Sequence, residues 1–146
     1  MTSRGRNPLA DGRVATGLPP ARDLERARRF CSEKLGLEPV DERPCGLLYR
    51  CASGESQLFR SAGAAPGTFT QTSWQVDDIE TAVSELRHRG VVFEEFEPAA
   101  VYGGGRTEDG IAEVEGHFRS TGARGDRDAW FRDSEGNMLS IGQPRY

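Results

Sequence analysis

The sequence has very little of what marks nucleic-acid-binding and membrane proteins. Lys34 is its only lysine, and the arginines are scattered among acids, giving a net charge of −4 without a basic stripe. Phosphate backbones are bound by clustered positive charge, so we expect no nucleic-acid partner. No apolar run approaches the roughly 20 residues that span a bilayer. The N-terminus also lacks the apolar stretch of a signal peptide, and we expect residues 1–12 to form a flexible polar tail and the protein to have no membrane partner.

Cysteine is scarce as well. The three cysteines, Cys31, Cys45 and Cys51, are an odd number and have no CxxC spacing. This pattern disfavours a disulfide framework or a zinc site and favours a reducing, cytoplasmic location. A Cys45–Cys51 bridge across a hairpin is an alternative, but free thiols are the simpler expectation.

The 146 residues are enough for one domain with a core. Two amphipathic helices are predicted over 23–35 and 78–89, each opening with an aspartate that can cap free backbone N–H groups. Their openings, DLERA and DIETA, match, and a glycine ends each helix at nearly the same distance (Gly36 and Gly90). This internal repeat predicts a duplicated supersecondary unit.

Strand-like runs surround both helices in the same order. One run precedes each helix and several follow it, so the chain is expected to repeat strand, helix and three strands. The helices should then cover one face of a mixed, mainly antiparallel sheet, which is an α+β fold. The predicted strands are 14–18, 38–43, 47–51 and 56–61 in the first half, and 70–76, 91–96, 111–117 and 128–142 in the second, the last broken by a turn at 134–137.

Three segments carry a resemblance to a known family: LPPARDLERARRFCSEKLGLEPV (18–40), WQVDDIETAVSELRHRGVVF (74–93) and AWFRDSEGNMLSIGQ (129–143). Together they resemble the vicinal oxygen chelate superfamily of glyoxalases, bleomycin-resistance proteins and extradiol dioxygenases. The resemblance implies a single domain over 13–146, with two βαβββ modules at about 13–62 and about 68–143. It also implies that the sheets form a cup with the helices on its convex side, and that the protein is a homodimer.

In metal-dependent members of that family, four strands each contribute one ligand. The matching positions here are Thr16, Gln57, Gln71 and Ser140, and all four are neutral. Hydroxyls and amides are poor ligands for transition metals, which bind imidazole, thiolate or carboxylate. We therefore expect a cup without a metal or other cofactor.

Strand alternation extends this set to a group of predicted ligand-binding residues. Residues two apart on a strand share a face, so the neighbours of the four matching positions should line the cup while Trp74 lies in the core. The predicted ligand-binding residues are Thr16, Gln57, Phe59, Gln71, Ser73, Gln75, Trp130, Met138 and Ser140.

A separate polar pattern lies on the run 111–117. Glu113, Glu115 and His117 recur at every second residue, with Ala112, Val114 and Phe118 on the other face. If the polar face lines the cup, the three could form a catalytic acid–base site, because burial and like charge shift carboxyl pKa values apart. The competing interpretation, which we favour, is a solvated strand face neutralised by nearby arginines.

Two functions follow from these patterns. The first, which we prefer, is a protein that binds or sequesters an aromatic or polycyclic small molecule. The second is a glyoxalase-like lyase or isomerase that uses Glu113, Glu115 or His117 for proton transfer. The sequence does not identify the ligand.

Overall fold

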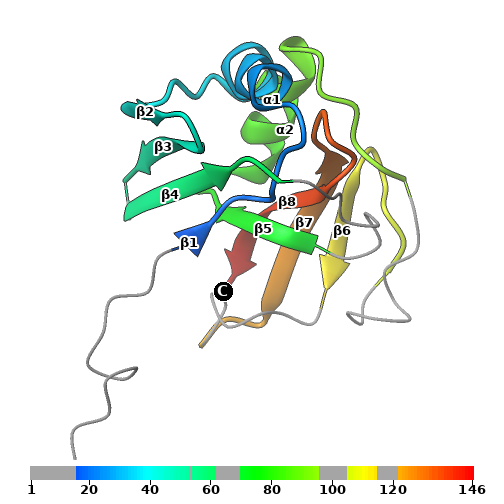
Figure 1. Cartoon of the computed structure of the whole chain (residues 1–146). Helices are drawn as coiled ribbons and strands as arrows, with labels where there is room; N and C mark the ends of the chain where they lie inside the picture. The colour runs from blue at the N-terminus through cyan, green and yellow to red at the C-terminus, as the bar shows by residue number, and fades with distance from the viewer. Residues whose placement is uncertain (1–15, 53, 62–69, 96–104, 115–121) are drawn as a thin grey trace, which may run out of the picture.

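Two modules with the same order of elements make up the protein (Figure 1). The computed structural model describes residues 16–52, 54–61, 70–95, 105–114 and 122–146. The first module contains β1 (Thr16–Gly17), α1 (Leu24–Phe30), the π-helical segment η1 (Cys31–Leu35), β2 (Asp41–Arg43), β3 (Gly46–Cys51) and β4 (Gly54–Phe59). The second contains β5 (Thr70–Gln75), α2 (Ile79–His88), β6 (Ile111–Val114), β7 (Gly125–Arg132) and β8 (Met138–Arg145). The predicted α+β fold is confirmed.

Each module builds an open four-stranded sheet with the same connectivity. The strand orders are β1-β4-β3-β2 and β5-β8-β7-β6. In both sheets the first strand pairs in parallel with the last, and the other pairs are antiparallel. The predicted repeat of strand, helix and three strands is therefore present in both halves.

The predicted strand 91–96 does not form over residues 91–95, the part of it that the structure describes. Phe93 forms only an isolated bridge with Phe131, and the Glu94 N–H donates to the Trp130 carbonyl. The reason is that β6 already occupies the same edge of β7 over 126–129, which leaves only the end of β7 for this segment.

The two helices begin and end as the repeat predicts. The Asp23 carboxylate accepts a hydrogen bond from the Arg26 N–H, and the Asp78 carboxylate accepts from the N–H groups of Glu80 and Thr81. These bonds satisfy donors that a helix start otherwise leaves free. After the helices the chain turns through glycines with φ of 69° at Gly36 and 96° at Gly90, a region in which other residues are strained.

Both helices lie on the same side of the strands (Figure 1) and pack into adjoining cores. Trp74 and Leu35 contact both cores, so the predicted core position of Trp74 is confirmed. The buried residues of the first core are Leu18, Ala21, Ala27, Cys31, Leu47, Tyr49 and Leu58, and those of the second are Ile79, Val83, Val91, Phe93, Ala129, Phe131, Leu139 and Ile141.

The turn between β7 and β8 joins the two modules. The Asp133 carboxylate accepts from the N–H groups of Glu135 and Asn137, which fixes the turn. Glu135 then accepts from the Arg26 guanidinium at 2.6 and 3.0 Å and from the Asp23 N–H at 3.1 Å. We call these contacts between Glu135 and the start of α1 the module latch. The DSEGN stretch thus holds module two against module one.

The surroundings of the module latch shift the pKa values of two carboxyl groups in the turn. The hydrogen bond from Arg26 lowers the pKa of Glu135 below its usual value. Burial raises the pKa of Asp133, against the hydrogen bonds that it accepts from Asn137 and Glu135. The pKa values of these two carboxyl groups are therefore shifted in opposite directions, because Glu135 bonds a cation whereas burial dominates at Asp133.

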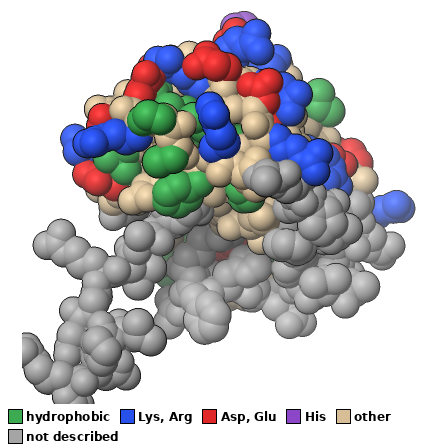
Figure 2. All heavy atoms as spheres, viewed as in Figure 1, with side chains coloured by type: hydrophobic (Ala, Val, Ile, Leu, Met, Phe, Trp, Pro, Cys, Tyr) green, Lys and Arg blue, Asp and Glu red, His purple; other side chains and the backbone are tan. Residues whose placement is uncertain are grey.

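The face of the molecule seen in Figure 2 is mixed in charge. Figure 2 shows acidic and basic side chains intermixed, with a smaller group of hydrophobic side chains over the strands of module one. Neither described helix has the length and apolar character needed to cross a bilayer. All three cysteines are free thiols, as expected, with Cys31 buried and Cys45 exposed.

Candidate functional site

The face of each sheet that carries no helix, here called the helix-free face, holds most of the predicted ligand-binding residues whose side chains the structure describes. In module one, Leu47, Tyr49 and Leu58 point to the helix. The alternating residues Leu48 and Gln57, which are paired across β3 and β4, point the other way. Both are half-buried, and Phe59, two residues beyond Gln57, is 48% exposed.

A small pocket occupies this face of module one. It has a volume of about 200 Å³, and its lining includes Leu48, Gln57 and Phe59. The pairing Arg43–Gly46–Phe59 runs across β2, β3 and β4, with Gly46 in the middle of the row. Glycine leaves the space between the two larger side chains open. A Cβ at Gly46 would lie 2.6 Å from the Leu58 carbonyl oxygen, so the position admits no other residue without a shift of β4.

The helix-free face of module two is covered instead of open. Trp130 is 2% exposed and packs with Ala112 and Val114 in a third cluster, with Met138 half-buried beside it. Sequence alternation correctly separates Trp130 from the helix-side residue Phe131. Because Trp130 is buried, its ring forms part of the core of this sheet in the described structure.

Ser140 lies directly opposite Trp130, on β8. Its hydroxyl donates to the Ser73 hydroxyl of β5 at 2.7 Å, and Ser140 is 4% exposed. Two neighbouring strands are joined by this bond at the position where the family resemblance implies a carboxylate ligand. On β5, Ser73 and Gln75 are exposed.

The predicted residue Gln71 lies in a β-bulge. Thr70 pairs with Met138 and Thr72 with Leu139, which leaves Gln71 as the extra residue of β5. Its side-chain carbonyl oxygen is buried and makes no hydrogen bond to the described residues. A buried acceptor without a partner is costly, and such groups are uncommon.

These residues do not form a transition-metal site. The Gln57 and Gln71 amides and the Ser140 hydroxyl offer only neutral oxygens, and Ser140 already bonds Ser73. The side chain of Thr16 lies outside what the structure describes. Among the described residues, no three histidine, cysteine or acidic side chains converge in a way that could hold a metal ion. The donor set therefore does not fit the metal that the resemblance implies.

Two acids on the helix-free face were missed by sequence reasoning. Asp126 and Asp128 alternate with Trp130 along β7 and are 0% and 1% exposed. The same period of two that places Trp130 on this face also places them there. Acids are rarely fully buried, so position 128 is easily taken for the polar start of a strand.

Glu113 does not share the helix-free face, the position that the acid–base alternative requires. Ala112 and Val114 lie in the cluster with Trp130, so Glu113 points to the helix side, where it pairs across the sheet with Arg127. The reason is that the second sheet is buried on both faces, and the small apolar residues of β6 belong to the helix-free one. Glu115 and His117 lie outside the described residues.

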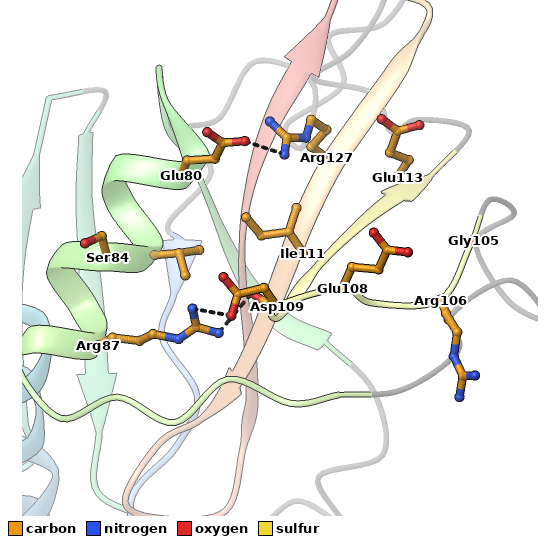
Figure 3. A pocket seen from close by; sticks show the side chains of 11 residues that line it. Glu80, Ser84, Arg87, Gly105, Arg106, Glu108, Asp109, Ile111, Glu113 and Arg127 are labelled. Carbon is orange, nitrogen blue, oxygen red and sulfur yellow. Dashed lines mark hydrogen bonds and ion pairs between the residues drawn. The ribbon is translucent and has the colours of Figure 1, made fainter.

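Glu113 borders a polar cleft of about 670 Å³ between α2 and the β6–β7 edge (Figure 3). Arg127 pairs with Glu80 and Arg87 with Asp109, both at 2.9 Å. Glu113 itself is exposed and lies 3.4 Å from Arg145. The cleft is thus a solvated surface lined by ion pairs.

Comparison with solved structures identifies the fold. The sequence matches no protein-family model and no curated protein. The structure is similar to a glyoxalase/bleomycin resistance protein/dioxygenase from Alicyclobacillus acidocaldarius (TM-score 0.62, 16% identity, 95% of this chain and 94% of that one). It is also similar to TnmS3, an antibiotic-binding protein from Streptomyces sp. CB03234 (TM-score 0.61, 19% identity, 92% and 98%). A third similar structure is a lactoylglutathione lyase from Agrobacterium tumefaciens (TM-score 0.55, 18% identity, 91% and 93%).

These structures include both binding proteins and enzymes, and each match covers nearly the whole of both chains. The identities are low, so the likeness concerns architecture. The chain has the fold of the glyoxalase, bleomycin-resistance and dioxygenase proteins, the vicinal oxygen chelate fold.

Proposed function

We propose that this protein binds an aromatic or polycyclic small molecule on its helix-free face without the help of a metal. The observation that carries the proposal is the pocket of module one, where Phe59 remains 48% exposed beside Leu48 and Gln57. Ligand sites typically combine apolar walls with a few polar groups. Gln57 and Phe59 belong to the ligand-binding set predicted from the sequence.

Two further features support binding without a metal. The buried carbonyl oxygen of Gln71 on β5, which does not line the module-one pocket, has no partner among the described residues, so a donor on a larger ligand would satisfy it. The Ser140–Ser73 bond occupies the position at which the resemblance implies a metal-binding carboxylate. Among proteins of this fold, TnmS3 is described as antibiotic-binding, which shows that the architecture serves ligand binding elsewhere.

A panel of aromatic natural products, screened by thermal shift and then by product analysis, tests the proposal. We expect at least one compound to raise the melting temperature and to be recovered unchanged. Phe59→Ala should weaken its binding by about 1–2 kcal/mol, the scale of losing part of an aromatic contact. If Phe59→Ala leaves tight binding unaffected, the ligand binds elsewhere on the protein. Recovery of a converted product would identify an enzyme.

The competing proposal is a lyase or isomerase that works by acid–base chemistry. Glu113 no longer supports it, because this residue lies on the side opposite Trp130 and Ser140. The observation that favours it is the pair Asp126 and Asp128, two buried carboxylates on the helix-free face. Under this proposal, Asp128→Asn abolishes turnover while ligand binding survives.

A further inference from the structure

The module-one pocket contains a cation as well as an aromatic ring. Arg43 and Phe59 flank Gly46 in one row across the sheet. Directly paired residues share a face, so both side chains border the same hollow. The next row, Asp41–Leu48–Gln57, adds the carboxylate that pairs with Arg43, an apolar wall and an amide.

The Arg43 guanidinium has hydrogen-bond donors that no described residue uses. Its side chain is 74% exposed and contacts Asp41 through Nε alone, at 3.1 Å. Both terminal amino groups of its guanidinium are left without a partner among the described residues. The Asp41 carboxylate in turn accepts from the Glu42 N–H at 2.8 Å. An exposed ion pair between near neighbours is weak, about 0–1 kcal/mol, so it is easily exchanged for a better anion.

The size of the pocket limits what it can hold. Its volume of about 200 Å³ is below the range of about 300–1,000 Å³ usual for drug-sized ligands. It therefore suits a one- or two-ring group, or one end of a larger polycycle. A planar ring has Phe59 and Leu48 to stack against, and Gln57 provides one donor and one acceptor.

We propose that the pocket selects planar aromatic acids, with the ring against Phe59 and Leu48 and the anionic group on the free edge of Arg43. The planar guanidinium matches a carboxylate in a two-point geometry that neutral or cationic groups do not offer. This inference rests on the proposed function, because it names the class of ligand for the same face.

Three matched probes test the inference: 2-naphthoic acid, 2-naphthamide and 2-naphthylmethylamine, titrated into the full chain and followed by NMR. The acid should bind at least about tenfold more tightly than the amide or the amine, as expected for a charge-assisted two-point contact. Arg43→Gln should remove that preference and leave the affinity for the amide within about twofold of the unmodified protein. Phe59→Ala should weaken all three. Arg29→Gln, at an exposed arginine of α1, is the control and should change none of them.

Cys45 provides a second measurement that does not depend on substitutions. Its exposed thiol lies in the lining of the pocket, whereas Cys51 does not line it. Bound 2-naphthoic acid should slow alkylation of Cys45 by iodoacetamide, read by peptide mass, and leave Cys51 unchanged. Protection of both cysteines or of neither contradicts the inference.

The outcomes separate the two proposals. Equal binding of the three probes, or an acid preference that survives Arg43→Gln, overturns the inference and leaves the proposed function standing. A stronger preference for the amine also overturns it. Failure of all three probes and of the wider aromatic panel to bind counts against the proposed function itself.

Discussion

The two modules share one topology but use their helix-free faces differently. In module one this face is open, with Phe59 48% exposed and Gln57 half-buried above a small pocket. In module two it is closed, with Trp130 2% exposed and Asp126 and Asp128 buried beside it. A sheet covered on one face can receive a ligand, and a sheet covered on both faces serves as core. Module two is therefore the more deeply packed half, and module one has the accessible face.

Strand length follows the same division. Strands β7 and β8 have 8 residues each, whereas β2 has 3 and is exposed throughout. The longer pair lets module two bury residues on both faces. It also extends the β7–β8 turn far enough to reach the start of α1 and form the module latch.

The largest expected difference between the modules is in the stability that is lost when the aromatic residue of each helix-free face is replaced by alanine. Trp130→Ala should cost about 3–5 kcal/mol in the free energy of unfolding, because it leaves a cavity in a closed core. Phe59→Ala should cost about 1 kcal/mol or less, since the side chain is already half in solvent. Urea denaturation with an unchanged m-value measures both. Similar losses for the two would show that the faces are equally buried.

The module latch should matter next. Glu135→Gln keeps the shape but removes the charge that faces Arg26, and we expect a loss of about 1–2 kcal/mol, the scale of a charge-assisted hydrogen bond. Glu55→Gln is the matched control in module one: its side chain is 49% exposed in the pair with Arg50, whereas that of Glu135 is only 4% exposed. An exposed pair contributes about 0–1 kcal/mol, so a control loss as large as that of Glu135→Gln would contradict the latch.

The latch also predicts a dependence on pH. The pKa of Glu135 is lowered by Arg26, so its stabilisation is present above the unfolded pKa of about 4.3 and is lost as pH falls through the folded value. The raised pKa of Asp133 acts in the opposite sense: its contribution is present in acid and is lost as pH rises. The difference in stability between the unmodified protein and Glu135→Gln should therefore shrink from pH 7 to pH 3. A constant difference would mean that Glu135 keeps its ordinary pKa.

The helix caps test how alike the repeats are. Asp23→Ala and Asp78→Ala should each cost about 1 kcal/mol. Asp78→Ala should cost more than Asp23→Ala, because the Asp78 carboxylate accepts hydrogen bonds from two backbone N–H groups and the Asp23 carboxylate from one. Thermal unfolding followed by circular dichroism measures the change. Asp77→Ala, at an exposed neighbour that does not cap the helix, is the control and should have almost no effect.

Glu113→Gln should have the smallest effect, below about 0.5 kcal/mol, because the residue is exposed and its ion pair with Arg145 spans 3.4 Å. Ligand binding should also be unchanged, because Glu113 lies on the helix side. If this variant loses binding of the same aromatic ligands, Glu113 belongs to the binding site.

The sequence predicts the fold well because its strongest signals are local. The caps Asp23 and Asp78 and the glycines after each helix are read within one turn of the chain, and the duplication repeats them. The site is harder, because alternation separates the two faces of a strand without saying which one meets the helix. At Trp74 the choice is correct, since a large aromatic favours the core. At Glu113 alternation leaves the choice open between the cup and a solvated face, and the packing of its apolar neighbours on the helix-free side decides it.

Two other features depend on contacts that a single strand does not reveal. The bulge at Gln71 exists only in the register of β5 against β8. The burial of Asp126 and Asp128 depends on what covers the sheet, while their own residue type suggests the surface.

The β7–β8 hairpin also bears on the order in which the protein folds. Its long strands are joined by a turn that Asp133 fixes with local hydrogen bonds, so it can form before distant parts of the chain meet. The parallel pairs β1–β4 and β5–β8 join residues far apart in sequence, such as Ser73 and Ser140, and must wait for a loop to close. We therefore expect the hairpin to be the folding nucleus. In pulse-labelling hydrogen exchange during refolding, the β7 and β8 amides should become protected first and those of β2 last; the reverse order would place the nucleus in module one.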